Sequence, residues 1–165
     1  MFKAFLYSLS SYNASPFAFN AVKILSDFGC DKIAFGTENA DIESLNKAVD
    51  ILLKEDFDNV GLMVGDSEDE ISKILVALDG TIEVIEEAVE KKCDLIFTHH
   101  PLIFSKPSAI TNKTIQGIKI RNLIKNNIAL YSAHTNLDSV NGGITDVLGK
   151  ILELENVTVL SSNPH

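Results

Sequence analysis

Three of the four histidines in this sequence, His99, His100 and His134, stand where apolar segments end. His99 and His100 are adjacent in the stretch DLIFTHHPLIF, and His134 follows the apolar stretch IALYSA. A carboxylate residue, Asp138, comes four positions after His134. Imidazole and carboxylate groups bind divalent metals and transfer protons near neutral pH. These four residues are therefore candidates for metal binding or for acid–base catalysis.

Apolar and amphipathic segments alternate around these residues. A near-continuous apolar run of strand length is typical of a buried parallel strand, and apolar residues spaced three or four apart are typical of a packed helix. The predicted strands are 73–80, 93–100 and 128–135, with an extended segment at 58–66 and a further strand at 156–162, and the predicted helices are 44–57, 81–92, 113–127 and 142–154. This alternation predicts an α/β fold, a three-layer lobe with a largely parallel sheet and helices on both faces.

The carboxyl ends of neighbouring parallel strands meet at one rim of a sheet, where open α/β proteins bind their ligands. The three histidines and Asp138 are expected at that rim. Successive residues of a regular strand point to opposite faces, so adjacent histidines share a site only where the chain leaves the sheet. Pro101 favours an extended conformation at His100. The histidine pair then serves two adjacent metal ions, or one histidine binds and the other supports it.

Asp79 ends another predicted strand, in VALDG, and reaches the same rim. It contacts a ligand there or only caps the turn before the helix at 81–92, and the pattern favours the cap. The glycines of residues 58–66 lack the spacing of a phosphate loop, because no GKS or GKT follows them. Neither cysteine lies beside a histidine and no nucleophile-elbow motif is present. Metal chemistry is therefore favoured over nucleophilic catalysis.

The composition limits the cellular setting. Apolar residues make up 45% of the chain, but no apolar run approaches the roughly 18–20 residues needed to span a bilayer. The net charge of −9, from 14 basic and 23 acidic residues, disfavours nucleic acids and favours cations. Cys30 and Cys93 form no CxxC pair, which fits a reducing compartment. We therefore expect a cytoplasmic protein without a membrane segment or a nucleic-acid partner.

Three stretches together resemble a known family, the GTP cyclohydrolase 1 type 2 homologues, also called NGG-interacting-factor-like proteins. They are DNVGLMVGD, the long stretch KILVALDGTIEVIEEAVEKKCDLIFTHHPLIF and IALYSAHTNLDSVNGGITDVLGKILEL, and the resemblance covers about residues 45–160. THHPLIF and SAHTNLD, in this order and spacing, are the most specific motifs. The resemblance implies an α/β fold, ring-shaped hexamers built as trimers of dimers, and a dinuclear metal site at the inner wall of the ring.

The resemblance also implies roles for individual residues. His99 and His100 match the paired histidines and Asp138 matches the carboxylate of the HTNLD motif, so these three are the expected metal ligands. His134 matches a residue of the same pocket and is the expected catalytic acid or base. Asn59 matches a motif near the site. Zn, Fe, Mn and Ni all suit imidazole and carboxylate ligands, so any of these divalent metals is expected.

Full-length members of the family continue into a second lobe that supplies a further His and a Glu to the metals. Residues 44–165 are therefore expected to be a metal-binding α/β lobe that lacks the second half of the family, after a segment of unclear role at 1–43. One function is then a metal-dependent hydrolase of nucleotide-like substrates. The alternative is a truncated, non-catalytic module for metal binding or oligomer assembly, with bare apolar surface that finds a partner. A homo-oligomer is expected in both cases.

Overall fold

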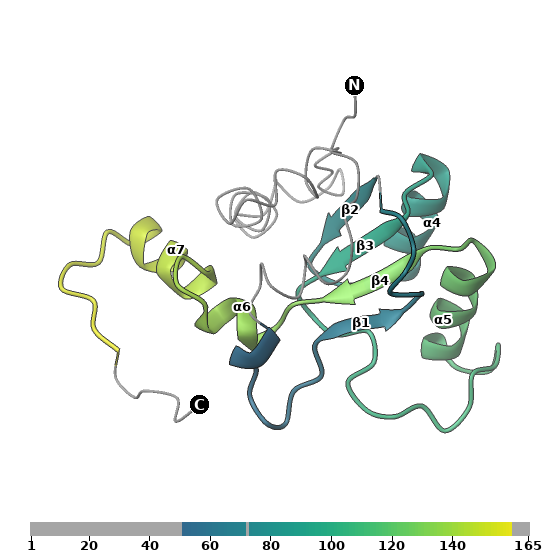
Figure 1. Cartoon of the computed structure of the whole chain (residues 1–165), viewed down its shortest axis with the longest axis horizontal. Coiled ribbons are helices and arrows are strands. Elements are labelled where there is room, and N and C mark those ends of the chain that lie inside the picture. Colours follow the sequence, from purple (N-terminus) through teal and green to yellow (C-terminus); the bar gives the residue numbers. More distant parts are fainter. Residues whose placement is uncertain (1–50, 72, 160–165) are drawn as a thin grey trace.

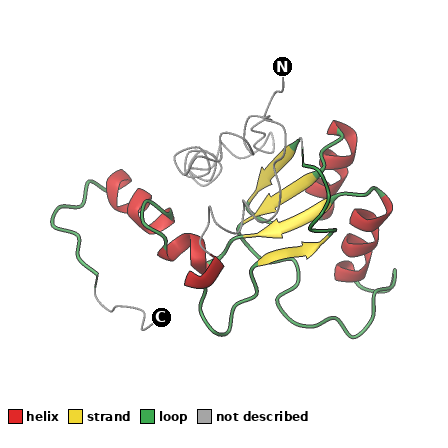
Figure 2. Ribbon diagram, viewed as in Figure 1, coloured by secondary structure: helices red, strands yellow, loops and turns green. Residues whose placement is uncertain are grey.

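A four-stranded sheet with flanking helices forms the described part of the chain (Figures 1 and 2). The computed structural model describes residues 51–71 and 73–159. The strands are β1 (Gly61–Val64), β2 (Ile74–Ala77), β3 (Leu95–Thr98) and β4 (Ala129–Ser132). The helices are the 3₁₀ turn η1 (Ile51–Leu53) and the α-helices α4 (Ile82–Lys91), α5 (Ile115–Lys125), α6 (Thr135–Ser139) and α7 (Ile144–Ile151).

The sheet has the strand order β1-β4-β3-β2. β2, β3 and β4 run parallel, and the edge strand β1 runs antiparallel to β4. β3 and β4 pair without a shift, from Leu95 with Ala129 to Thr98 with Ser132. The predicted α/β fold with a largely parallel sheet is therefore confirmed.

One face of the sheet packs against α4 and α5. Each helix begins at a threonine, Thr81 or Thr114, whose side-chain oxygen accepts a hydrogen bond from a backbone N–H of the first turn. Both helices bury their apolar residues against alternate residues of the strands. The resulting core contains Leu75, Val84, Ile85, Ala88, Ile96, Ile120, Leu123 and Leu130.

The other face of the sheet carries the second hydrophobic core. Its strand residues are the alternate set, including Phe97 and Tyr131, whose rings stack with centroids 5.8 Å apart. Leu137 of α6 and Val140 after it complete the buried cluster, and Leu53 and Ile144 pack at its edge. Side chains of successive strand residues thus enter two different cores, as the period-2 geometry of a strand requires.

Two parts of the predicted secondary structure differ from the structure. The strand predicted at 128–135 ends at Ser132, and residues 135–139 form the short helix α6 instead. Residues 156–159 form no strand: they pair with none of the strands among the described residues, and Val157 and Val159 are exposed. The expected helix at 44–57 is described only from residue 51, and the segment 1–43 lies outside the described residues.

None of the helices in the described part of the chain has the length and apolar character needed to cross a bilayer.

Candidate metal centre

Two parallel strands bring the three histidines together. Thr98 and Ser132 are the last residues of β3 and β4 and lie opposite one another. His99 and His100 follow the first, and His134 follows the second after one residue. The buried Thr98 hydroxyl donates to the carbonyl oxygen of His100 and lies 2.8 Å from the Ser132 hydroxyl. The two strand ends are thus joined directly beneath the histidines.

The imidazole rings of His99, His100 and His134 form one cluster. The ring centroid of His99 lies 5.1 Å from that of His100 and 5.0 Å from that of His134, and the third pair is 5.7 Å apart. One ring nitrogen from each residue lies within 4.8 Å of the others. The rim of the parallel sheet therefore does collect the three histidines, as the strand-end argument predicted.

In each of these rings, Nδ1 faces a group that accepts hydrogen bonds. A carbonyl or carboxylate oxygen has no hydrogen to donate, so Nδ1 must carry the hydrogen. The lone pair is then on Nε2, the form in which imidazole binds a metal. The pairs are His99 with the Ala133 carbonyl oxygen at 2.9 Å, His100 with Asp79 Oδ1 at 2.8 Å and His134 with Asp58 Oδ1 at 3.0 Å.

The local environment favours a neutral imidazole at His99. Burial lowers its pKa below the usual value, and this effect exceeds the opposing effects of the Ala133 carbonyl hydrogen bond and the Asp138 carboxylate. The neighbouring His134 and His100 rings lower the pKa of His99 further. A neutral imidazole is the form that coordinates metals, so His99 needs to lose no proton at neutral pH.

Asp138 lies beside the cluster. It belongs to α6, and its Oδ1 atom is 3.8 Å from Nε2 of His99, the ring nitrogen that carries the lone pair. Its side chain is 40% exposed, against 12% for His99. The structure thus places the predicted carboxylate ligand next to the histidine cluster.

Asp58 is the functional residue that the sequence did not single out. Its side chain is fully buried, Oδ1 accepts hydrogen bonds from His134 Nδ1 and Asn59 N, and Oδ2 accepts from Thr135 N and the Thr135 hydroxyl. Burial raises the pKa of Asp58, but these bonds from Thr135 and His134 outweigh it and hold the pKa below its usual value. Asp58 is therefore an ionised partner of His134.

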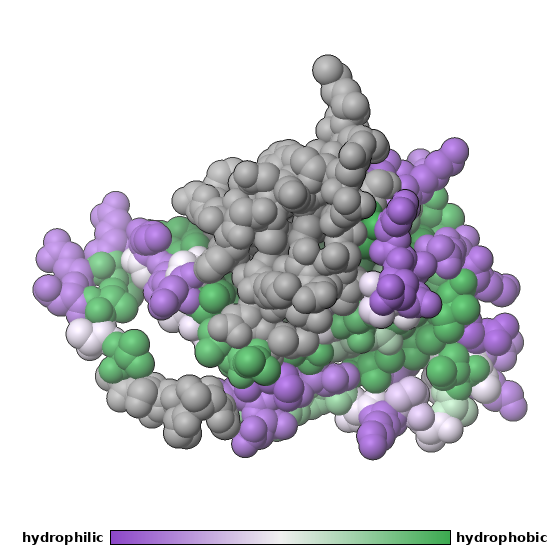
Figure 3. Space-filling view, viewed as in Figure 1, coloured by the Kyte–Doolittle hydropathy of each residue, from purple (hydrophilic) through white to green (hydrophobic). Residues whose placement is uncertain are grey.

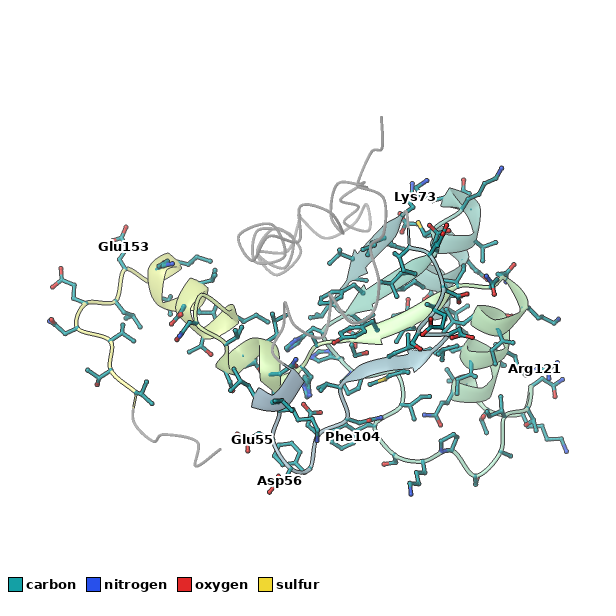
Figure 4. The ribbon with its side chains drawn as sticks, in the orientation of Figure 1. Glu55, Asp56, Lys73, Phe104, Arg121 and Glu153 are labelled. Carbon is teal, nitrogen blue, oxygen red and sulfur yellow. The ribbon has the colours of Figure 1, made fainter. Side chains whose placement is uncertain are left out.

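The segment that carries Asp58 lies where α6 begins. Glu55 and Asp56 mark this segment between η1 and β1 (Figure 4). The backbone N–H of Glu55 donates to the Thr135 hydroxyl at 3.0 Å, which attaches the segment to α6. The signal in the sequence is an acidic residue in the DNVGL motif, next to Asn59. Nothing local indicated a contact 76 positions away.

Asp79 and Asn59 both act on the histidine region. The cap of α4 is Thr81, and the Asp79 carboxylate accepts a hydrogen bond from His100 Nδ1 instead. This pair is more exposed than the pair of Asp58 and His134. Asn59 donates its side-chain amide to the carbonyl oxygen of Ile103, in the loop after the histidine pair. Asn59 therefore ties that loop to the strand β1 region.

The donor set fits a divalent transition metal. Three imidazoles and an adjacent carboxylate are the ligand types that Zn, Fe, Mn and Ni accept. Each imidazole has its second nitrogen held by an oxygen, the arrangement that orients metal-binding histidines in proteins. His165 and the rest of residues 160–165 lie outside the described part of the chain.

Two family models match parts of the sequence. Residues 39–164 match the model described as Duf34/NIF3 (NGG1p interacting factor 3). Residues 5–63 match a model described as HIGH Nucleotidyl Transferase, and that segment contains no histidine. The first match includes every residue of the histidine cluster, and the second lies mostly outside the described residues.

Bacterial proteins named GTP cyclohydrolase 1 type 2 homolog are close in sequence. Identity to the protein of Clostridium acetobutylicum is 57% over 113 residues, which cover 68% of this chain and 42% of the relative. Identity to the protein of Clostridium perfringens is 60% over 112 residues, covering 68% and 43%. The matched region thus spans less than half the length of these relatives.

Solved structures share the fold. A Bacillus cereus protein related to NIF3 superposes with a TM-score of 0.70 at 34% identity, covering 77% of this chain and 36% of that one. Reduced HcgD from Methanocaldococcus jannaschii superposes with a TM-score of 0.65 at 36% identity, covering 73% and 50%.

Proposed function

Because the chain belongs to the Duf34/NIF3 family, we propose that it is a metal-binding protein in which His99, His100 and His134 each offer one ring nitrogen to a divalent cation. One observation carries the proposal: three ring nitrogens lie within 4.8 Å of one another, and each ring has its Nδ1 atom facing an acceptor. Three histidines without a common function would not be expected to share this arrangement. The arrangement favours metal binding through Nε2.

Asp138 is proposed as a further ligand. Its carboxylate is already close to Nε2 of His99, and its partial exposure lets the side chain move without breaking a buried contact. A carboxylate beside three neutral imidazoles also reduces the positive charge of a bound cation, which stabilises the complex. The ligand set proposed from the sequence, His99, His100 and Asp138, is thereby extended by His134.

The proposal extends to hydrolysis of a nucleotide-like substrate. The relatives' name, GTP cyclohydrolase 1 type 2 homolog, supports that substrate class, and the region matched covers 42–43% of those relatives. A bound divalent cation supplies Lewis acidity to such a reaction. If the cation is instead held by His99, His100 and Asp138 alone, His134 is the residue proposed to transfer protons, since Asp58 keeps its Nδ1 protonated and its Nε2 atom can then accept a proton.

Metal analysis of the purified chain tests the proposal. The wild-type protein should bind Zn or Mn at a defined stoichiometry in equilibrium dialysis. The double variant His99→Ala, His100→Ala should lose that binding while retaining its circular dichroism spectrum, because neither histidine is in a hydrophobic core. Hydrolysis of GTP with and without added metal is then measured on both proteins. Equal metal content in the two proteins would refute the proposal.

Exposed apolar residues favour a second candidate function, a non-catalytic assembly module. Hydrophobic and hydrophilic residues are intermixed on the surface of α7 and the segment after it (Figure 3). No residue of α7 is buried, and the exposed set comprises Leu148, Ile151, Leu152, Leu154, Val157 and Val159. Exposed apolar surface tends to contact a partner, and a second copy of the chain is the proposed one.

Light scattering separates the two candidates. A homo-oligomer that dissociates in a Leu148→Glu, Ile151→Glu variant, without loss of bound metal, supports assembly through this surface. A monomer at all concentrations contradicts the assembly function and leaves the metal proposal unaffected. The hexameric ring and the cytoplasmic location remain predictions of the sequence.

A further inference from the structure

Asp58 stands apart from the other charged residues of the site. Among residues 51–71 and 73–159 it is the one charged residue that is buried. Asp79 and Asp138, the other carboxylates near the histidines, are both substantially exposed. A buried carboxylate is stable only when hydrogen bonds compensate for its lost hydration. The four donors on Asp58 provide that compensation, and one of them is His134.

The two oxygens of Asp58 have separate partners. Oδ2 is held by the backbone N–H and the hydroxyl of Thr135, which fixes the plane of the carboxylate. Oδ1 is thereby directed at Nδ1 of His134, at 3.0 Å. His134 itself makes no side-chain cap for α6, so its ring is not held by the helix that it precedes. Asp58 is the group that orients this ring.

We propose that Asp58 is a positioning residue that holds His134 by its Nδ1–H group, directs Nε2 into the histidine cluster and thereby strengthens metal binding. This inference rests on the proposed function, since it concerns the affinity of the same cluster. The carboxylate acts in two ways. It selects one tautomer of the ring, and its charge raises the electron density on the opposite nitrogen.

The negative charge is required, and an amide of the same shape does not replace it. An asparagine has one accepting oxygen and one NH₂ group. If the oxygen faced His134, the NH₂ group would face Thr135, whose hydroxyl can accept but whose backbone N–H can only donate. If the oxygen faced Thr135, the NH₂ group would face the Nδ1–H of His134 and the backbone N–H of Asn59. In either orientation donors oppose donors within a buried site. Asp58→Asn therefore removes the charge that holds His134 and leaves a buried donor opposed by another, with little change in volume.

The tautomer of His134 is the first measurement. Long-range ¹H–¹⁵N spectra of the metal-free protein distinguish a ring protonated on Nδ1 from one protonated on Nε2, and a His134→Gln variant assigns the signals. The wild type should show His134 protonated on Nδ1, and Asp58→Asn should shift it towards the Nε2 form. A wild-type His134 protonated on Nε2 overturns the inference, whether or not the variant folds.

Metal affinity is the second measurement. Competition with a chromophoric chelator should show binding of Zn about 10–100-fold weaker in Asp58→Asn than in wild type. Thr135→Val is the matched control: it removes a hydrogen bond from the same carboxylate but keeps the contact between Asp58 and His134. Its metal affinity should fall much less than that of Asp58→Asn, even though its stability falls, because the Thr135 backbone N–H still holds Oδ2. If Asp58 only stabilised the fold, Asp58→Asn and Thr135→Val would instead change the metal affinity to a similar extent.

The outcomes separate this inference from the proposed function. If the wild type binds Zn and folded Asp58→Asn binds it equally well, the inference fails and the proposed function stands. If the wild type binds no Zn, Mn, Fe or Ni, the proposed function fails, and with it the claimed effect of Asp58 on affinity. The tautomer measurement then still decides whether Asp58 orients His134.

Discussion

The Nδ1 atom of His99 lies 2.9 Å from the carbonyl oxygen of Ala133, 34 positions further along the chain. The backbone at the end of one strand thus orients the imidazole at the end of its neighbour. This contact needs no special residue at position 133, because every residue has a carbonyl group. His99 is therefore oriented by the sheet, whereas His100 and His134 depend on the carboxylates of Asp79 and Asp58.

Loss of the exposed pair of His100 and Asp79 should weaken metal binding less than loss of the more buried pair of His134 and Asp58. In Asp79→Asn, water can replace the lost acceptor, because both side chains are about half exposed. We expect metal affinity to fall by at most about tenfold, the lower end of the range for such partners. Calorimetric titration with Zn measures this. Glu90→Gln on α4 makes the same change in net charge at another exposed carboxylate and should leave the affinity unchanged.

His134→Ala distinguishes a metal ligand from a proton-transfer residue. As a ligand, His134 supplies one of three imidazole nitrogens, so the variant should bind metal much more weakly than the wild type. If His134 acts only as an acid or base, His134→Ala should leave the metal content unchanged and lower kcat. Metal content and hydrolysis rate are measured on the same preparation. A variant that keeps both its metal and its rate would exclude either role.

Asp58 should stabilise the fold at neutral pH and lose this effect in acid. The folded-state pKa of Asp58 is lowered, so its contribution is complete above the unfolded-state pKa, about 4, and disappears as pH falls through the folded-state pKa. Asp58→Asn should reduce the free energy of unfolding by about 1.5–3 kcal/mol at neutral pH. Urea unfolding of the wild type and Asp58→Asn across the acid range checks this. A difference in unfolding free energy between them that increases as the pH falls would contradict it.

Two helical glycines should respond oppositely to alanine. A Cβ atom at Gly117 would lie 2.1 Å from the Thr111 carbonyl oxygen, so Gly117→Ala should destabilise the protein by about 1–3 kcal/mol. At Gly149 the nearest atom is 4.0 Å away, so Gly149→Ala should stabilise α7 by about 0.5–1 kcal/mol. Thermal unfolding compares them. A melting temperature that rises in both variants would show that the backbone at Thr111 yields easily.

Cys93 should be unreactive in the folded protein. Burial raises the pKa of its thiol, so little thiolate is present at neutral pH. In a Cys30→Ser background, a thiol reagent should label Cys93 only as fast as the protein unfolds. Because the folded-state pKa is raised, stability should also decline once the pH exceeds the unfolded-state value of about 8.5. Rapid labelling without denaturant would contradict the observed burial.

The sequence predicted the main elements because each has a local signal. The apolar runs of β2, β3 and β4 and the threonine caps of α4 and α5 are readable within about ten residues. The grouping of the histidines followed from one general rule about the ends of parallel strands. The convergence of His99, His100 and His134 was therefore predictable, although their tautomers were not.

Other features had no local signal. α6 is only five residues long and has no side-chain cap at His134, so neither an apolar period nor a capping residue marks its start at Thr135. The role of Asp58 depends on a contact between the segment before β1 and the end of β4. The antiparallel edge strand β1 is set by pairing rather than by its residues. The local amino-acid pattern does not determine which distant segments of the chain contact one another.

Alignment between β3 and β4 has a consequence beyond packing. Phe97 and Tyr131 enter one apolar layer while Ile96 and Leu130 enter the other. Sliding β4 by a single position would reverse every side chain of that strand and part His99 from Ala133. Substitutions in the sheet core that allow this shift in register would thus abolish the proposed cation binding, although they lie far from the proposed metal ligands. A screen for inactive variants should recover such substitutions together with substitutions of the histidines.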